Sequence, residues 1–376
     1  MNTAYRFVYP FLPVIARGLG VPLEQAALLV SVRHISGLAT PAVARAMGHG
    51  ELRRRLITTG LLLFVAGSAV TAVTSLYVGA LLGFALLGLA KPVFDISAQA
   101  YISDRVPYDQ RARHLAVFEF TWAGALLVGA PATGWLISKT DWATPFWVFG
   151  VLTVVAILLV PRFVDADHLT PHTSLVSRRF GRTGIAFLAV AGFFSLASEM
   201  IIVVFGAWLE NSFGLSLAAL GGAAFLIGAS ELAGEGATFG FTDRIGKRRA
   251  VIVGLTVSAI AFALLIPVRN EMALGLAMLG IALFGFEFTI VSSIPLASEL
   301  VPQARAKYLA WMVVAMSLAR GIGAAVGPIL FRSFGLTGPA LAAVAADILA
   351  MALLVAFVTE RHIGSDNLDR QPRPDS

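Results

Sequence analysis

The sequence contains no cysteine, which excludes disulfide bonds, thiolate catalysis and cysteine-ligated metal centres. Charge is also sparse, because Asp, Glu, Lys and Arg make up only 13% of the 376 residues, about half the fraction found in soluble domains. No G-x-x-x-x-G-K-[ST] phosphate-binding loop occurs, so ATP hydrolysis by this chain is not expected. The first residues also lack the basic segment that opens a cleavable signal peptide.

Hydrophobic residues, in contrast, make up 57% of the chain, and the mean hydropathy is +0.81. A water-soluble domain could not cover its surface with so few polar side chains. The composition therefore predicts an integral membrane protein. The pI of about 10.0 requires no nucleic-acid partner, because membrane proteins concentrate Arg and Lys in their cytoplasmic loops.

Long apolar segments separated by polar breaks predict an all-α membrane fold with twelve spanning helices, since one span needs about 20 mainly apolar residues. The predicted spans are residues 1–17, 24–46, 56–75, 77–102, 115–138, 143–161, 184–209, 217–240, 250–268, 272–298, 308–331 and 338–358. Most Lys and Arg residues fall in alternate connections, on the side of both termini. The positive-inside bias therefore predicts a multi-pass protein of the plasma membrane with both termini in the cytoplasm.

The first span is unusual, because Arg6 falls near mid-bilayer with few residues before it. An arginine at that depth is costly unless protein or water surrounds it. We expect the natural protein to have about ten more apolar residues before Met1, which would complete the span.

The chain contains an internal repeat. When RRR at 53–55 is aligned with KRR at 247–249, YISDRVP at 101–107 meets LASELVP at 296–302 with a one-residue shift. Two six-helix halves are typical of transporters, whose site lies at the repeat interface near mid-membrane. The predicted divisions are a first half at 1–161, a cytoplasmic linker at 162–183, a second half at 184–358 and a cytoplasmic tail at 359–376.

The loop TDRIGKRR at 242–249 concentrates charge between two apolar segments. With the repeat and the number of spans, it resembles the major facilitator superfamily, whose loop motif reads roughly G-x-L-a-D-R-x-G-R/K-R/K. The matching residues are Asp243, Arg244, Gly246, Lys247 and Arg248. The first-half copy GHGELRRR at 48–55 keeps the bases and lacks the acid. The resemblance covers the whole chain and implies transport by alternating access.

Helix five resembles that family's antiporter motif G-x-x-x-G-P-x-x-G-G in part, with other residues at several of the usual glycine positions, and helix eleven has the G-x-x-x-G-P spacing. The residues concerned are Gly129, Pro131, Gly134, Gly323, Gly327 and Pro328. The helix-five resemblance favours an antiporter. Small residues at these positions also let helix backbones pack closely, whatever the function.

The loop at 242–249 has two interpretations. Its bases anchor the cytoplasmic side of the membrane, and this alone could account for them. Alternatively, Asp243 accepts hydrogen bonds from the N-terminus of a neighbouring helix and forms a latch that breaks when the halves rock.

Ionisable residues inside spans are costly, and they usually face protein or water and serve function. The candidates for the substrate or proton pathway are Arg6, Arg33, His34, Lys91, Asp95, Glu119, Glu199, Glu231, Glu235, Glu287 and Arg320. Lys91 and Asp95 share one helix face, so they form either an intrahelical ion pair or part of the cavity. Glu231 and Glu235 also share a face, which suits reversible protonation unless basic groups on adjacent helices pair with them.

The predicted function is secondary active transport of a small molecule, most simply the proton-coupled export of amphipathic compounds. An uptake carrier for a sugar, an organic ion or another metabolite is the alternative. A membrane-embedded enzyme or a non-transporting receptor is a third class, although the scattered histidines do not favour an enzyme. We expect no cofactor, no bound metal and no nucleic-acid partner, and we expect a monomer to suffice because one chain holds both halves.

Overall fold

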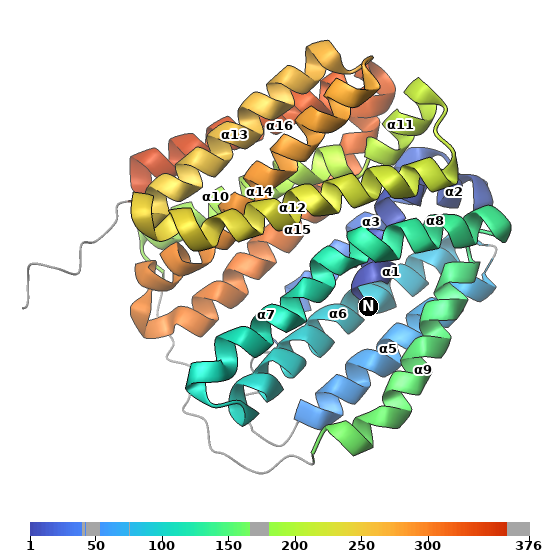
Figure 1. Cartoon of the computed structure of the whole chain (residues 1–376), viewed down its shortest axis with the longest axis horizontal. Coiled ribbons are helices and arrows are strands. Elements are labelled where there is room, and N and C mark those ends of the chain that lie inside the picture. Colours follow the sequence, from blue (N-terminus) through green and yellow to red (C-terminus); the bar gives the residue numbers. More distant parts are fainter. Residues whose placement is uncertain (40–41, 43–52, 75, 166–179, 359–376) are drawn as a thin grey trace, which may run out of the picture.

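The structure, a computed structural model, describes residues 1–39, 42, 53–74, 76–165 and 180–358. Within these ranges every regular element is a helix, and the helices run side by side in two groups (Figure 1). The blue-to-green helices belong to the first half of the chain, and the yellow-to-red helices belong to the second.

Within the described residues, the first group contains ten helical segments. They are α1 (Asn2–Arg6), α2 (Val8–Gly18), α3 (Leu23–Ile35), η1 (Ser36–Ala39), α5 (Arg53–Val73), α6 (Tyr77–Arg105), α7 (Tyr108–Gly124), the π-helical turn η2 (Ala125–Gly129), α8 (Ala130–Lys139) and α9 (Thr144–Phe163), with η2 continuing α7 into α8.

The second group repeats this arrangement. Its segments are α10 (Arg182–Ile202), α11 (Phe205–Phe213), α12 (Leu217–Ile245), α13 (Lys247–Val268), α14 (Met272–Leu300), η3 (Pro302–Ala304), α15 (Arg305–Phe334) and α16 (Thr337–Phe357).

Ten helices in the described ranges are long and apolar enough to cross a membrane. The first two predicted spans are absent from this set, because α1 and α2 are short and α3 is followed by η1 and then by residues outside the described ranges. The first predicted span is therefore wrong as one continuous helix. The predicted fold class, an all-helical membrane protein built from two six-helix halves, is confirmed.

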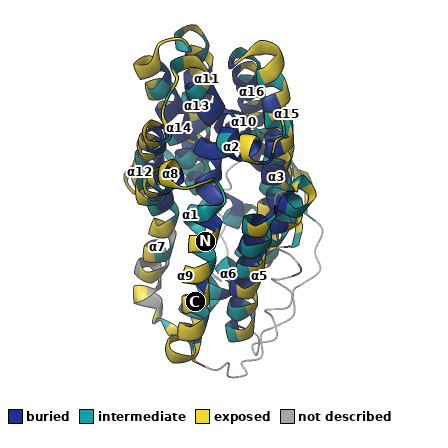
Figure 2. Cartoon of the chain, turned by 90° about the vertical axis from the view of Figure 1, so that its right-hand side faces the viewer, coloured by how far each residue is buried: buried dark blue, intermediate teal, exposed yellow. Residues whose placement is uncertain are grey.

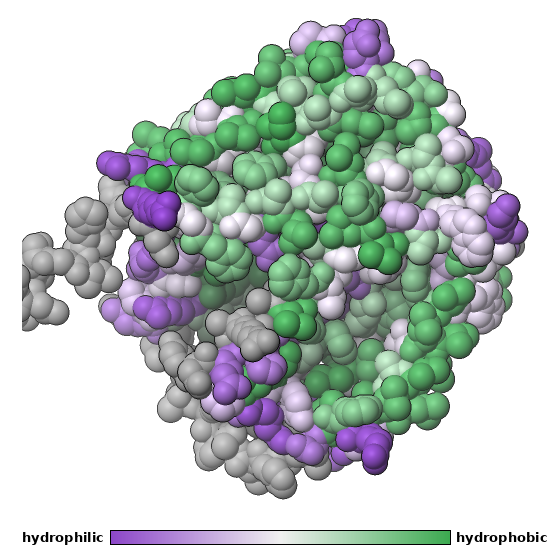
Figure 3. Space-filling model, viewed as in Figure 1, coloured by the Kyte–Doolittle hydropathy of each residue, from purple (hydrophilic) through white to green (hydrophobic). Residues whose placement is uncertain are grey.

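The outer surface is that of a membrane protein. Large apolar side chains such as Leu62, Leu158, Phe239 and Ile260 are exposed, whereas buried residues gather along the middle of the bundle (Figure 2). Figure 3 shows apolar residues covering much of the bundle, with hydrophilic residues gathered mainly toward its edges. A surface of this kind is stable only where lipid covers it.

Turn glycines mark the two ends of the bundle. Gly20 (φ 65°) follows α2, and Gly246 (φ 89°) separates α12 from α13. A side chain at either position would be strained, so glycine is required for these reversals. We call the two ends the Gly20 end and the Gly246 end.

The two halves pack closely through glycine. A Cβ added at Gly221 in α12 would lie 2.9 Å from the Cα of Pro131 in α8, and one added at Gly206 in α11 would lie 2.4 Å from the Pro10 carbonyl oxygen in α2. Such distances leave no room for a side chain, so backbone packs directly on backbone. These contacts join the halves between the middle of the bundle and the Gly20 end.

Two ion pairs join the halves at the same end. Arg17 in α2 lies 2.8 Å from Glu210 in α11, and Arg332 in α15 lies 3.1 Å from Glu24 in α3. Both arginines are well exposed, so each pair adds little stability by itself. Together with the glycine contacts they close the Gly20 end.

Candidate functional site

Two helices are interrupted at mid-bundle level. Pro10 has no N–H to bond the Arg6 carbonyl, and the first helix breaks at Phe7, between α1 and α2. Val203 and Val204 separate α10 from α11, without a proline at the break. Interrupted helices at membrane depth occur where backbone is buried in protein or lines a cavity. These breaks therefore mark a level of the bundle at which the backbone is held by surrounding protein or lines a cavity.

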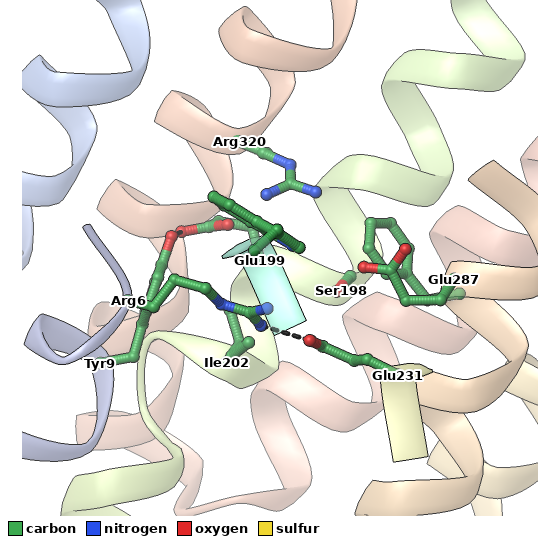
Figure 4. A pocket seen from close by; sticks show the side chains of 10 residues that line it. Arg6, Tyr9, Ser198, Glu199, Ile202, Glu231, Glu287 and Arg320 are labelled. Atoms are coloured by element: carbon green, nitrogen blue, oxygen red, sulfur yellow. Dashed lines mark hydrogen bonds and ion pairs between the residues drawn. The ribbon is translucent and has the colours of Figure 1, made fainter. Parts of the chain in front are cut away.

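A small cavity lies beside these breaks (Figure 4). Both halves line it, with residues from α1, α2 and α7 on one side and from α10, α12, α14 and α15 on the other. The lining residues are Arg6, Tyr9, Trp122, Ser198, Glu199, Ile202, Glu231, Phe286, Glu287 and Arg320. Charged and aromatic side chains thus converge at the interface between the halves.

A buried ion pair crosses this interface. Arg6 donates through Nη2 to Glu231 Oε1 at 2.6 Å, and the Arg6 guanidinium lies 4.5 Å from the centroid of the Trp122 ring (Figure 4). Arg6 is 2% exposed and Glu231 is 4% exposed. Removing one partner from a pair this deep would leave an uncompensated charge.

A second polar contact joins the halves beside the first. The Tyr9 hydroxyl donates to Glu199 Oε1 at 2.9 Å and also lies 2.9 Å from His34 Nε2. His34 Nε2 is 3.2 Å from the same Glu199 oxygen. Tyr9 and His34 come from the first half and Glu199 from the second, so this triad couples α2 and α3 to α10.

Two charged groups in the cavity have no hydrogen-bonding or ion-pairing partner in the described part of the chain. Neither Glu287 nor Arg320 forms a hydrogen bond or an ion pair with any residue that the structure describes, although both side chains point into the cavity (Figure 4). The Arg320 guanidinium lies 5.3 Å from the centroid of the Phe286 ring. An unpaired acid and an unpaired base are therefore available to a ligand.

The predicted pathway residues fall into two groups. Those that line the cavity are Arg6, Glu199, Glu231, Glu287 and Arg320. Those that do not line it are Arg33, His34, Lys91, Asp95 and Glu235. The side chain of Glu119 lies outside the described residues.

Lys91 lies beside the cavity, behind Trp122. Its Nζ pairs with Asp95 on the same helix and donates to Asn2 Oδ1 at 2.6 Å. Its Nζ also lies 5.1 Å from the Trp122 ring centroid. This geometry favours the intrahelical ion pair over direct contact with a substrate.

Arg33 stabilises the interrupted first helix. Its Nη1 donates to the Tyr5 carbonyl oxygen at 2.6 Å, and its guanidinium lies 4.4 Å from the Tyr5 ring centroid. Tyr5 in turn donates to the Leu87 carbonyl oxygen at 3.0 Å. Arg33 therefore positions α1 against α6 rather than facing the cavity.

Glu231 and Glu235 do not act as a matched carboxylate pair in this conformation. Glu231 pairs with Arg6, whereas Glu235, one turn further along α12, is only partly buried. The alternative interpretation, in which Glu231 pairs with a basic group on another helix, is the one the geometry favours.

The two halves carry opposite charge where they meet. Among the described residues that line the cavity, the first half contributes the cation Arg6, and the second half contributes the acids Glu199, Glu231 and Glu287 with the cation Arg320. The facing surfaces therefore attract each other across the cavity.

The packing motifs of helices five and eleven lie close to the cavity. Pro131 cannot bond the Leu127 carbonyl, and the helix widens into the π turn η2 immediately before it. A Cβ at Gly129 would lie 2.4 Å from Thr3, and one at Gly134 would lie 2.7 Å from Phe11.

The equivalent residues of helix eleven bring α15 against α10. A Cβ at Gly323 would lie 3.0 Å from the Glu199 Cβ, and one at Gly327 would lie 2.7 Å from the Met200 carbonyl oxygen. Pro328 follows directly within α15. Glycine at these positions therefore places Arg320 and Glu199 beside the same cavity.

The loop at the Gly246 end forms contacts inside the second half. Lys247 pairs with Glu299 of α14, and Arg248 Nη2 donates to the Val355 carbonyl oxygen at 3.1 Å, while Arg244 is exposed. The side chain of Asp243 lies outside the described residues, so its predicted role as a latch stays a prediction.

The first half contains an equivalent ion pair. Arg53 lies 2.8 Å from Asp104, and these residues align closely with Lys247 and Glu299 in the internal repeat. Arg53, at the end of the first-half copy of the loop motif, therefore makes the corresponding contact to α6, although that copy lacks the acid of the motif.

Sequence reasoning missed Tyr9 and Ser198 as cavity residues and the acids Asp104 and Glu299 as loop partners. One signal was available for Tyr9, since it lies three residues after Arg6, at the spacing that places two side chains on one helix face. In the part of the chain that the structure describes, no group of three or more His, Asp or Glu residues could hold a metal ion.

Comparison with known proteins agrees with this architecture. A family model described as Major Facilitator Superfamily matches the chain twice, at residues 1–187 and 187–374. The uncharacterized MFS-type transporter YwfA of Bacillus subtilis (strain 168) is 26% identical over 365 residues, which cover 93% of this chain and 87% of that protein.

Two relatives with more specific names match over shorter stretches. The multidrug transporter protein MdtP of Bacillus subtilis (strain 168) is 24% identical over 162 residues, 43% of this chain and 27% of that protein. The class C tetracycline resistance protein of Escherichia coli is 27% identical over 191 residues, 45% of this chain and 45% of that protein.

Solved structures share the fold. The human organic anion transporter MFSD10 (TETRAN) gives a TM-score of 0.68 at 17% identity and covers 94% of this chain and 96% of its own. The peptide transporter POT gives a TM-score of 0.73 at 12% identity, with 94% and 92% covered. The family match spans both halves, and the chain accordingly belongs to the major facilitator superfamily, whose members are multi-pass membrane transporters of small molecules rather than enzymes and are typically monomeric.

Proposed function

We propose that this protein exports amphipathic compounds in exchange for protons, by alternating access of one central cavity to the two sides of the membrane. The observation that carries the proposal is Glu287, a carboxylate without a partner among the described residues, in a cavity walled by aromatic rings. Trp122 and Phe286 supply apolar faces for the body of a substrate, and such faces also attract cations.

Exchange of substrate for protons follows if Glu287 binds either the proton or the cationic group of the substrate. A proton and a cationic group cannot occupy Glu287 together, because protonation removes the charge that attracts the cation. Substrate leaves when a proton arrives, and a proton leaves when substrate binds. The multidrug and tetracycline resistance names of two partial relatives support the direction of transport.

Alternating access requires contacts that can part on either side of the cavity. In this conformation the halves are joined at the Gly20 end by Arg17–Glu210 and Arg332–Glu24. Arg6–Glu231 and Tyr9–Glu199 join them at the cavity itself. Rocking of the halves, taken as residues 1–161 and 184–358, would separate the exposed pairs first, since these are the weaker ones.

The orientation of the chain is part of the proposal. Lys and Arg gather at the Gly246 end, which we place in the cytoplasm together with both termini. The cysteine-free sequence allows a direct test, because a single cysteine at Arg249 or at Glu271 can be labelled in intact cells. An impermeant maleimide is expected to reach the cysteine at 271 and not the one at 249, and the reverse pattern would contradict the orientation.

The latch at Asp243 is also proposed. In this proposal the Asp243 carboxylate binds the N-terminus of a neighbouring helix and holds the Gly246 end closed in the alternate conformation. Asp243→Asn is expected to slow transport while leaving the affinity for substrate unchanged. Unchanged transport by this variant would mean that the loop only anchors the cytoplasmic side of the membrane and forms no latch.

Proton coupling is tested in proteoliposomes with ethidium, an amphipathic cation. A pH gradient is expected to drive ethidium movement opposite to the proton flux in the wild type. Glu287→Gln is expected to lose gradient-driven movement and to bind ethidium more weakly, because the neutral amide lacks the charge that attracts the cation. The matched variant Glu271→Gln, in the turn before α14, is expected to behave as the wild type. Full gradient-driven transport by Glu287→Gln would refute coupling at this residue.

A further inference from the structure

Arg320 is a cation without an anion. It lines the cavity from α15 and makes no hydrogen bond or ion pair within the described part of the chain. Glu199 and Glu287 line the same cavity, and neither forms an ion pair with Arg320 in the part of the chain that the structure describes. The Arg320 guanidinium lies over the Phe286 ring.

Arg6 adds further unused donors to the same cavity. Only its Nη2 serves Glu231, while Nε and Nη1 are buried and have no acceptor. Buried N–H groups without acceptors are rare in proteins because they are costly. Arg6 comes from the first half and Arg320 from the second, so unused donors face the cavity from both halves.

The acids of the cavity are not equally free. Glu231 is bound by Arg6, and Glu199 is bound by Tyr9 and lies against His34. Glu287 is therefore the acid that remains for a cationic ligand group, and Arg320 is the base that remains for an anionic one. Guanidinium groups present a planar set of donors that suits carboxylate, sulfonate and phosphate oxygens.

We propose that the transported compound is a zwitterionic amphiphile, with its ammonium group at Glu287 and its anionic group at Arg320 and the unused N–H groups of Arg6. The proposal rests on the transport function given above and specifies the substrate class. An apolar body between the two charges would lie against Phe286 and Trp122, which line the same cavity. A substrate that is only cationic would leave the Arg320 charge uncompensated when it binds.

Three ligands with related aromatic groups carry both charges, the positive charge alone or the negative charge alone, so their affinities show what each charge contributes to binding. The probes are 3-(benzyldimethylammonio)propanesulfonate, which is a zwitterion at every practical pH, benzyltrimethylammonium and benzenesulfonate. Binding to the full-length protein in detergent is measured by isothermal titration calorimetry. The zwitterion is expected to bind at least about tenfold more tightly than either singly charged probe, as one added charge-assisted contact would give.

Variants assign each charge to its residue. Arg320→Gln is expected to remove the preference for the zwitterion and to leave the affinity for benzyltrimethylammonium within about twofold, whereas Arg320→Lys restores part of the preference. Arg269→Gln, in the turn after α13, is the control for arginine removal and is expected to bind as the wild type. The comparison of the three probes on the wild-type protein tests the inference without any variant, so it remains testable even if a variant fails to fold.

Equal affinity for the zwitterion and benzyltrimethylammonium, or no binding of the zwitterion, would overturn the inference. An undiminished preference in a folded Arg320→Gln variant would also overturn it. A clear preference without gradient-driven ethidium transport would instead reject proton-coupled export and leave the zwitterion site standing.

Discussion

The guanidinium of Arg6 and the carboxylate of Glu231 lie 2.5 Å apart across the boundary between the two halves, with side chains 3% and 5% exposed. The two residues are 225 positions apart in the sequence. Their pairing places an attractive contact between the halves, beside the cavity about which we propose that they rock. It also leaves Glu287, on the neighbouring helix α14, as the cavity acid without an ion-pairing partner among the described residues.

Glu231→Gln is expected to destabilise the protein by about 3–5 kcal/mol, because Arg6 would remain buried with no opposing charge. Thermal unfolding in detergent measures the effect. The double variant Arg6→Gln, Glu231→Gln removes both charges and is expected to recover most of the loss. A double variant no more stable than Glu231→Gln alone would show that the charges are not energetically coupled.

Tyr9→Phe is expected to cost about 1–3 kcal/mol, since Glu199 is buried and would lose a hydrogen-bond donor. Tyr77→Phe is the matched control, because the Tyr77 hydroxyl donates to the Gln25 carbonyl oxygen at an exposed position. Its unfolding temperature is expected to stay near that of the wild type. An equal fall in unfolding temperature in the two variants would mean that the Tyr9–Glu199 hydrogen bond stabilises the protein no more than the exposed one does.

Gly228→Val is expected to force the halves apart toward the Gly20 end. A Cβ at Gly228 in α12 would lie 2.7 Å from the Cβ of Leu126 in η2, across the interface. A single cysteine at Ser198, in the cavity, reports the opening through its labelling rate from the Gly20 side. The rate is expected to rise about tenfold or more, equivalent to a population shift of about 1.4 kcal/mol.

The control for this variant is Gly222→Val, on the same helix, where a Cβ would meet nothing within 4 Å. Its labelling rate is expected to match that of the parent. An equal rise in both variants would indicate general loosening of α12 rather than separation of the halves.

The halves and the approximate helix positions could be predicted from the sequence, because hydropathy and the repeat depend on residues close together in the chain. Arg6, Glu199 and Glu287 could also be selected, since a charge inside an apolar segment is conspicuous. Their pairings could not be predicted, because which acid meets Arg6 depends on how α1 and α12 pack. The break between α10 and α11 at Val203 and Val204 could not be predicted either, since neither residue is a proline or glycine.

The most direct test of alternating access is a pair of distances measured by pulsed electron paramagnetic resonance on spin labels attached to introduced cysteines. One pair, Lys139 and Ala218, reports the Gly20 end, and the other, Val117 and Phe239, reports the Gly246 end. During proton-driven exchange we predict two populations, in which the first distance lengthens as the second shortens. A single unchanging distribution at both ends, or widening of both ends together, would contradict the account.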